Sequence, residues 1–174
     1  MSLLNIISVN SNMKKYLILF YALFSSDVFA CSFAPMFEPF KVSGENSPKP
    51  NVPDFEVAKI KRGSDDGNYA SCSDAGMLSL TLRTKTIHPT GYLFKIIDGT
   101  MEDRLFYPEP IKPSIYFEEE GIFNFIWLDG SSEEQEEIEM SVEIIAVSKS
   151  GERSEPQVLK VSHPGVKKPW WKFW

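Results

Sequence analysis

The chain has 174 residues, of which 43% are hydrophobic and 24% are charged, and its formal net charge is −6. This composition suits one globular domain and excludes a long disordered chain. An acidic protein of this kind has no electrostatic basis for holding DNA or RNA, so nucleic-acid binding is excluded as well.

Residues 1–30 have the pattern of a secretory signal peptide. Met13, an alternative start, precedes two lysines and an apolar run at residues 16–24 that is too short to cross a bilayer of about 30 Å as a helix. Residues 28–30, Val-Phe-Ala, fit a signal peptidase site. We therefore expect an exported protein, periplasmic or secreted, whose mature chain begins at Cys31 with 16 basic and 23 acidic residues and a formal net charge of −7.

Cys31 and Cys72 are the only two cysteines of the chain. An oxidising compartment would pair them, and closing a loop of about 40 residues would stabilise the fold by about 4 kcal/mol in the chain-entropy model. The alternative is a lipoprotein, with a lipid on Cys31 and a buried thiol at Cys72. The bulky Phe29 argues against a lipoprotein signal, so we predict the disulfide.

A proline-rich N-terminal extension at residues 31–53 comes next, and it is predicted to be extended and unable to join the middle of a sheet. It either lies across the domain surface or forms a flexible linker.

Alternating apolar residues then predict a series of short strands. The proline-rich residues 105–113 indicate an edge strand or an irregular crossing, and the strongly apolar residues 122–128 indicate a central core strand. The other predicted strands lie at residues 54–61, 77–83, 92–97 and 115–117, and in a hairpin over residues 138–163. We expect an all-β fold of about seven strands, a single antiparallel two-sheet sandwich over residues 54–164.

The last hairpin carries a family resemblance. Its first strand ends on Ala146, a polar turn contains Gly151, and Ser-Glu-Pro at residues 154–156 enters the final strand. In this order it resembles the last hairpin of a fibronectin type III or related immunoglobulin-like domain, although Met140 stands where that family has a corner tyrosine. The chain is also similar to small exported proteins of Gram-negative bacteria. The resemblance implies an immunoglobulin-like sandwich and supplies no activity.

Residues suited to catalysis are few. His88 and His163 each precede a proline at a predicted strand end, and no further ligands stand at a spacing suited to a metal. No G-x-S-x-G nucleophile motif occurs. We expect a protein that is not an enzyme, with no catalytic residue, no metal and no cofactor, and a hydrolase ranks last among our hypotheses.

Two charged segments are candidate binding sites. In the basic aromatic tail, residues 165–174, lysines alternate with aromatic side chains, a composition that favours a membrane surface or a protein partner. The tail residues concerned are Lys167, Lys168, Trp170, Trp171, Lys172, Phe173 and Trp174. Alternatively, the tail folds back and covers an open face of the sandwich. The second segment is the acidic run at residues 131–137, a solvated loop by default, with Glu133, Glu134, Glu136 and Glu137.

Two functions fit these segments. The first is an exported, non-catalytic binding module that contacts an envelope protein or a glycan through its loops or its tail, with contact to a membrane surface as a further option. The second is an inhibitor or immunity-type protein that blocks a secreted enzyme through its acidic loops.

Overall fold

The computed structural model describes residues 35–68, 71–84, 88–99, 101, 104–115, 121–130 and 132–167. The predicted signal peptide, Cys31 and the tail from Lys168 onward lie outside these residues. The chain divides into two units after Ala30, and all described residues belong to the second unit. No helix in the described part of the chain has the length and apolar character needed to cross a membrane.

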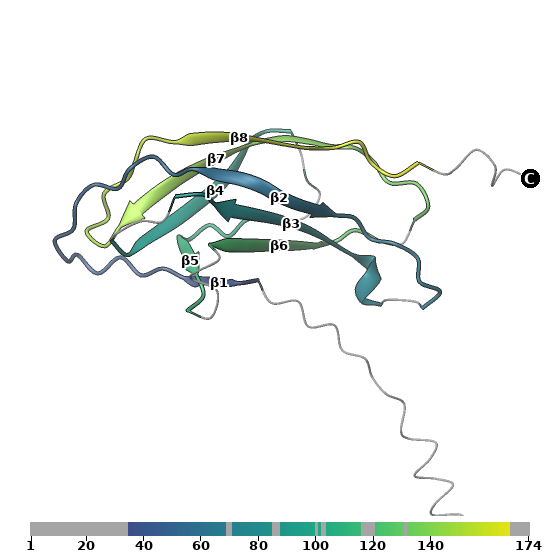
Figure 1. Cartoon of the computed structure of the whole chain (residues 1–174), viewed down its shortest axis with the longest axis horizontal. Helices are drawn as coiled ribbons and strands as arrows, with labels where there is room; N and C mark the ends of the chain where they lie inside the picture. Colours follow the sequence, from purple (N-terminus) through teal and green to yellow (C-terminus); the bar gives the residue numbers. More distant parts are fainter. Residues whose placement is uncertain are drawn as a thin grey trace, which may run out of the picture. The chain divides into compact units, whose positions relative to one another are not determined.

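Two antiparallel sheets make up the domain (Figure 1). The larger sheet has the strand order β1-β5-β4-β7-β8, and the smaller has the order β2-β3-β6. The elements are β1 (Phe37–Pro39), β2 (Phe55–Lys61), the 3-10 helix η1 (Cys72–Asp74), β3 (Ala75–Leu82), β4 (Thr90–Asp98), β5 (Ile111–Pro113), β6 (Ile122–Leu128), β7 (Ile138–Ser148) and β8 (Gln157–His163). The predicted all-β class with two antiparallel sheets is confirmed. Eight strands are described where about seven were expected. Part of the proline-rich extension forms β1, whereas the strand predicted at residues 115–117 lies, beyond Ile115, outside the described residues.

The prolines keep two strands of the larger sheet short. β5 has three residues and pairs with β4 only at Tyr92 and Ile111, while its other side pairs with β1. Residues 105–113 were predicted as an edge strand or an irregular crossing. The edge strand was wrong, because β1 occupies the edge beside β5, whereas residues 105–110 form no strand and fit the irregular crossing. Pro39 and Pro113, which lack an N–H group, stand at the last positions of these two strands, where a missing donor disturbs the pairing least.

β6 lies at the edge of the smaller sheet, so its predicted central position was also wrong. Its apolar composition has another cause, since Phe123 and Phe125 face the core while the opposite side is covered as well. There the Asn124 N–H donates to the carbonyl of Pro35 at 2.9 Å, and the buried Ser79 hydroxyl donates to Asn124 Oδ1 at 2.8 Å. Burial on both faces gives an edge strand the composition of a central one.

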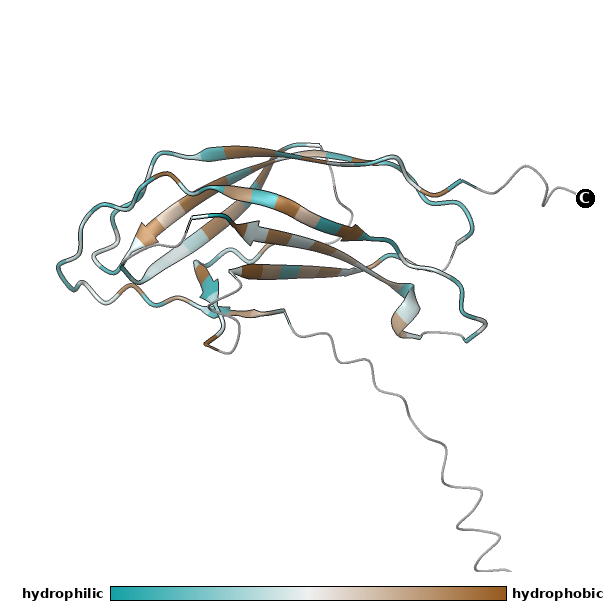
Figure 2. Ribbon diagram, in the orientation of Figure 1, coloured by the Kyte–Doolittle hydropathy of each residue, from teal (hydrophilic) through white to brown (hydrophobic). Residues whose placement is uncertain are grey.

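The apolar faces predicted from alternation are confirmed. Leu78 and Leu80 of β3 point into the core, as do Val142, Ile144 and Ala146 of β7, and each of the five side chains is at most 1% exposed. Figure 2 shows the alternation of hydrophobic and hydrophilic residues along β2. Period-two alternation is what a strand with one buried face requires.

Aromatic rings fill the space between the sheets. The ring of Phe123 on β6 is centred 5.4 Å from Phe55, 5.8 Å from Tyr92 and 5.6 Å from Phe94. Phe55 belongs to the smaller sheet, whereas Tyr92 and Phe94 belong to β4 of the larger one. Phe123 therefore joins the two sheets through direct ring contacts, most of them edge-to-face or tilted.

Candidate functional site

The glutamate-rich segment between β6 and β7 lies at one end of the domain, which we call the acidic end. We call residues 132–137, between β6 and β7, the acidic loop. The strand register shows which segments lie next to the acidic loop. Leu128 at the end of β6 pairs with Ala75 at the start of β3. Likewise, Ile138 at the start of β7 pairs with His163 at the end of β8. The loops after β2, β6 and β8 therefore meet at the acidic end.

A buried ion pair forms the centre of the acidic end. The Nε and Nη2 atoms of Arg62, just after β2, donate to the two carboxylate oxygens of Asp129, just after β6, at 2.8 and 3.0 Å. The side chains are only 9% and 6% exposed. Such two-point pairing fixes the orientation of both groups. Because the pair is buried, loss of either partner would leave an uncompensated charge.

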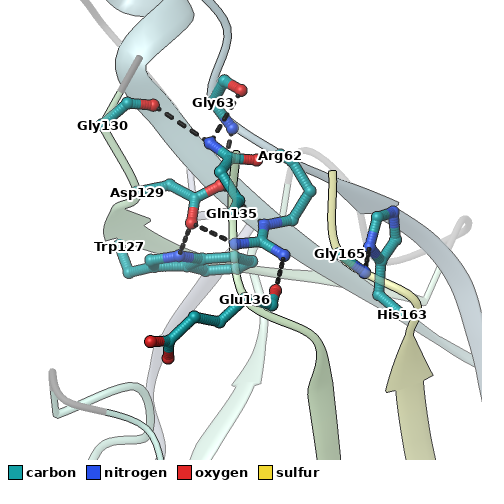
Figure 3. Close-up of polar contacts among 9 residues, drawn as sticks. All are labelled: Arg62, Gly63, Trp127, Asp129, Gly130, Gln135, Glu136, His163 and Gly165. Carbon is teal, nitrogen blue, oxygen red and sulfur yellow. Dashed lines mark hydrogen bonds and ion pairs between the residues drawn. The ribbon is translucent and has the colours of Figure 1, made fainter. Parts of the chain in front are cut away.

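Two further hydrogen-bond donors contact the Asp129 carboxylate (Figure 3). The Gly63 N–H donates to Oδ2 at 2.6 Å, and the indole N–H of Trp127 donates to Oδ1 at 3.0 Å. A Cβ at position 63 would collide with the backbone carbonyl oxygens of Gly130 and Asp74, so only glycine brings its N–H this close to the carboxylate.

The same network holds the acidic loop. Arg62 Nη1 donates to the Glu136 carbonyl at 2.7 Å, and the Gln135 side-chain amide donates to the carbonyls of Gly63 and Gly130 at 3.0 and 3.3 Å. Figure 3 shows the Glu136 carboxylate pointing away from Arg62, so this residue joins the network only through its backbone. The backbone of the loop is thus held at Gln135 and Glu136.

The acidic loop is also joined to the segment that leads into the tail. Gln135 and Val166 exchange two backbone hydrogen bonds of 2.9 and 3.0 Å and form an isolated antiparallel bridge. Lys167 follows directly and lines a hollow of about 640 Å³ together with Glu134 and Glu136. The acidic loop and the described start of the predicted tail, residues 165–167, therefore come together at this point.

A second hollow, of about 280 Å³, lies between the ion pair and the acidic loop. Its apolar wall includes Met101, Trp127 and Leu128, and the Leu128 side chain is 79% exposed. Glu134, Glu136 and Glu137 also line it. None of these three carboxylates forms an ion pair with another described residue. The surface therefore combines uncompensated negative charge with exposed apolar area.

The environment of Asp129 sets its ionisation. Burial by itself would raise the pKa of Asp129, but the hydrogen bonds from Arg62, Gly63 and Trp127, together with the Arg62 charge, outweigh burial and hold this pKa below its usual value. The carboxylate is therefore ionised whenever the pH is near neutral.

This lowered pKa predicts a pH-dependent stability. The stabilisation from Asp129 is fully present above the unfolded pKa of about 3.9 and is lost as the pH falls through the lower folded pKa. We expect the difference in the free energy of unfolding between the natural protein and an Asp129→Asn variant, measured by urea denaturation, to shrink from about pH 6 to about pH 2.

Asp66 supplies the control for this pH series. A backbone hydrogen bond from Asn68 and a hydroxyl bond from Ser71 lower the pKa of Asp66 as well, but its carboxylate is fully exposed. An Asp66→Asn variant should therefore follow the natural protein closely. A pH-independent difference for Asp129→Asn would contradict the assignment.

The other predicted site residues have mixed outcomes. Of the tail, only residues 165–167 are described, and the predicted residues from Lys168 to Trp174 lie outside the described part. Cys72 begins η1, but Cys31 is not described, so the disulfide stays a prediction.

His88 and His163 lie at opposite ends of the larger sheet, since Thr90 pairs with Ser148 and His163 with Ile138. Among the described residues, no group of three or more His, Cys, Asp or Glu side chains could hold a metal ion.

Sequence reasoning missed Arg62 and Asp129. Neither residue stands in a recognised motif, and neither was among the predicted site residues. The available signal was Trp127, because a buried indole N–H requires an acceptor nearby.

The chain matches no family model, no curated protein and no solved structure.

Proposed function

We propose that this protein is an exported, non-catalytic binding module that contacts an envelope protein or a glycan, and that the acidic end is its main contact surface. The observation that carries the proposal is the Arg62–Asp129 network, which holds the acidic loop in one conformation beside exposed Leu128. A charged surface held rigid before binding loses little conformational entropy when a partner docks.

Export to an oxidising compartment and a Cys31–Cys72 disulfide belong to this proposal. The Pro35 carbonyl bonds to Asn124, four residues along β6 from Leu128 and therefore about 13 Å from it. Leu128 in turn pairs with Ala75, which follows η1 and Cys72. The four residues from Cys31 to Pro35 can span up to about 14 Å, a reach similar to this separation, which supports the proposed pairing. The mass of the mature protein distinguishes a disulfide from a lipid on Cys31.

An immunoglobulin-like, fibronectin type III-like identity is also part of the proposal. Strand order supports it: if β2, β3 and β6 correspond to strands A, B and E, then β4, β7 and β8 correspond to C, F and G, which share the other sheet. In that arrangement the acidic loop connects strands E and F at one end of the sandwich, where loops of such domains gather.

The second candidate is an inhibitor or immunity-type protein that blocks a secreted enzyme. The surroundings of Leu128 favour it, because this exposed apolar side chain lines the same hollow as Glu134, Glu136 and Glu137 and so offers a hydrophobic anchor beside negative charge. A basic active-site entrance would complement this surface. The two candidates differ in whether the captured partner is an enzyme that loses its activity.

A capture experiment tests the proposed function. The mature protein, a variant with residues 133, 134, 136 and 137 changed from Glu to Gln, and a chain ending at Lys167 are compared on envelope and secreted extracts. The last chain keeps Val166, whose bridge to Gln135 must remain intact. We expect the neutralised loop to lose the partner, and we expect rising salt to weaken capture by the natural protein.

The matched control carries four Glu→Gln changes at positions 45, 109, 152 and 155, all exposed and outside the acidic end. This control should capture the partner as the natural protein does. Equal capture by the neutralised loop would overturn the assignment of the acidic end, and loss of capture only on removing the tail would move the binding site to the tail. Inhibition of a captured enzyme would favour the second candidate.

A further inference from the structure

We propose that the chain supplies its own ligand for the acidic end: tail residues 168–174 dock into the hollow of about 280 Å³ beside the acidic loop and must be displaced when a partner binds. The inference rests on the proposed function, since it takes the acidic end as the binding surface. It also specifies the chemistry of the partner, a segment that carries lysine or arginine next to tryptophan or phenylalanine.

The first argument is position. The Gln135–Val166 bridge fixes the chain at the acidic loop immediately before the tail begins. Lys167 already shares a hollow with Glu134 and Glu136, two residues that also line the proposed docking site. The seven residues that follow can extend up to about 24 Å, so they reach every part of this hollow.

The second argument is chemical complementarity. The site offers carboxylates of Glu134, Glu136 and Glu137 that are not paired with described residues, beside the exposed side chain of Leu128. The tail, Lys-Pro-Trp-Trp-Lys-Phe-Trp, offers two lysines and four aromatic rings. The hollow lies near the lower limit of the usual range of ligand pockets, about 300–1,000 Å³, which suits one or two side chains.

The third argument is effective concentration. A short linker keeps an attached ligand at an effective concentration in the millimolar range, so even weak affinity suffices for docking within one chain. A tail from a second copy would need tighter binding at ordinary protein concentrations. Because the affinity of the tail itself can be weak, a partner with a better-fitting basic aromatic segment can displace it.

Amide NMR spectra test the proposal. The intact mature protein is compared with the chain ending at Lys167, and the synthetic peptide Lys-Pro-Trp-Trp-Lys-Phe-Trp is then added to the shortened chain. We expect the amides of Leu128 and residues 134–138 to shift on truncation and to return toward the intact positions as peptide is added. The peptide should bind with a dissociation constant below about 1 mM, the value at which an attached tail is mostly docked.

Two variants of the shortened chain identify the site. Changing Glu134, Glu136 and Glu137 to Gln should weaken peptide binding several-fold, whereas the control changes at Glu45, Glu152 and Glu155 should leave it unchanged. Identical spectra at the acidic end with and without the tail, or peptide shifts confined to another surface, would overturn the proposal.

The outcome is separable from that of the capture experiment. If the tail docks, the chain ending at Lys167 captures more partner than the intact protein, because its competitor has been removed. If the spectra show no docking while the acidic loop still captures a partner, this inference fails and the proposed function stands.

Discussion

Replacing Phe123 with alanine should destabilise the domain by about 3–5 kcal/mol, the usual cost of removing a fully buried phenylalanine from a packed core. Phe123 is 0% exposed, and its ring contacts Phe55 of its own sheet as well as Tyr92 and Phe94 of the opposite sheet. The truncation therefore leaves a cavity between the two sheets, which the surrounding rings cannot fill without leaving their own rotamers.

Urea denaturation of the mature protein, with its disulfide state checked by mass, measures this loss. Val158→Ala is the control, because Val158 lies on β8 and is 56% exposed, and we expect it to change stability by no more than about 0.5 kcal/mol. Domains of this size are stable by about 5–15 kcal/mol, so the Phe123 variant should remain measurable or lie close to unfolding. A loss below about 1 kcal/mol for Phe123→Ala would contradict the packing described above.

The fold class could be predicted from the sequence because period-two alternation is a local property. A strand with one buried face must place apolar residues at every second position, as Leu78 and Leu80 do in β3 and Val142 and Ile144 do in β7. Whether a strand lies at the edge or in the centre of its sheet depends on segments that are remote in the sequence. β6 has the composition of a central strand although it is an edge strand, since Asn124 and its neighbours are covered by the segment at Pro35, which is remote in the sequence.

The candidate site could be predicted only in part, for the same reason. The acidic loop is visible as a run of glutamates, but its fixed conformation depends on Arg62 and Asp129, which are 67 residues apart. Trp127, two residues before Asp129, accounts for one of the four hydrogen bonds that the carboxylate receives, but no local pattern indicates the other three. Only the tertiary structure brings Arg62, Gly63 and Trp127 to Asp129, so the site is a consequence of the sandwich and not of a motif.

The second large effect is expected at Asp129. An Asp129→Asn variant keeps the size of the side chain but removes the charge that compensates Arg62, whose side chain is only 9% exposed. Removing one partner of a buried ion pair costs about 3–5 kcal/mol, because the remaining charge stays buried without compensation. The exposed pair of Arg83 and Glu56, 3.6 Å apart, supplies the control, and Glu56→Gln should cost at most about 1 kcal/mol.

The same variant tests the link between the ion pair and function. Arg62 also bonds to the Glu136 carbonyl, so loss of its partner should loosen the acidic loop at Glu136, although the Gln135 bonds remain. Partner capture should weaken although every glutamate is retained. A double variant, Arg62→Leu with Asp129→Asn, removes the uncompensated charge and should recover part of the stability lost in the single variant. It should not recover partner capture, because the anchor of the loop at Glu136 is then gone. Full capture by the double variant would show that the acidic loop needs no fixed conformation, and the role proposed for the ion pair would be withdrawn.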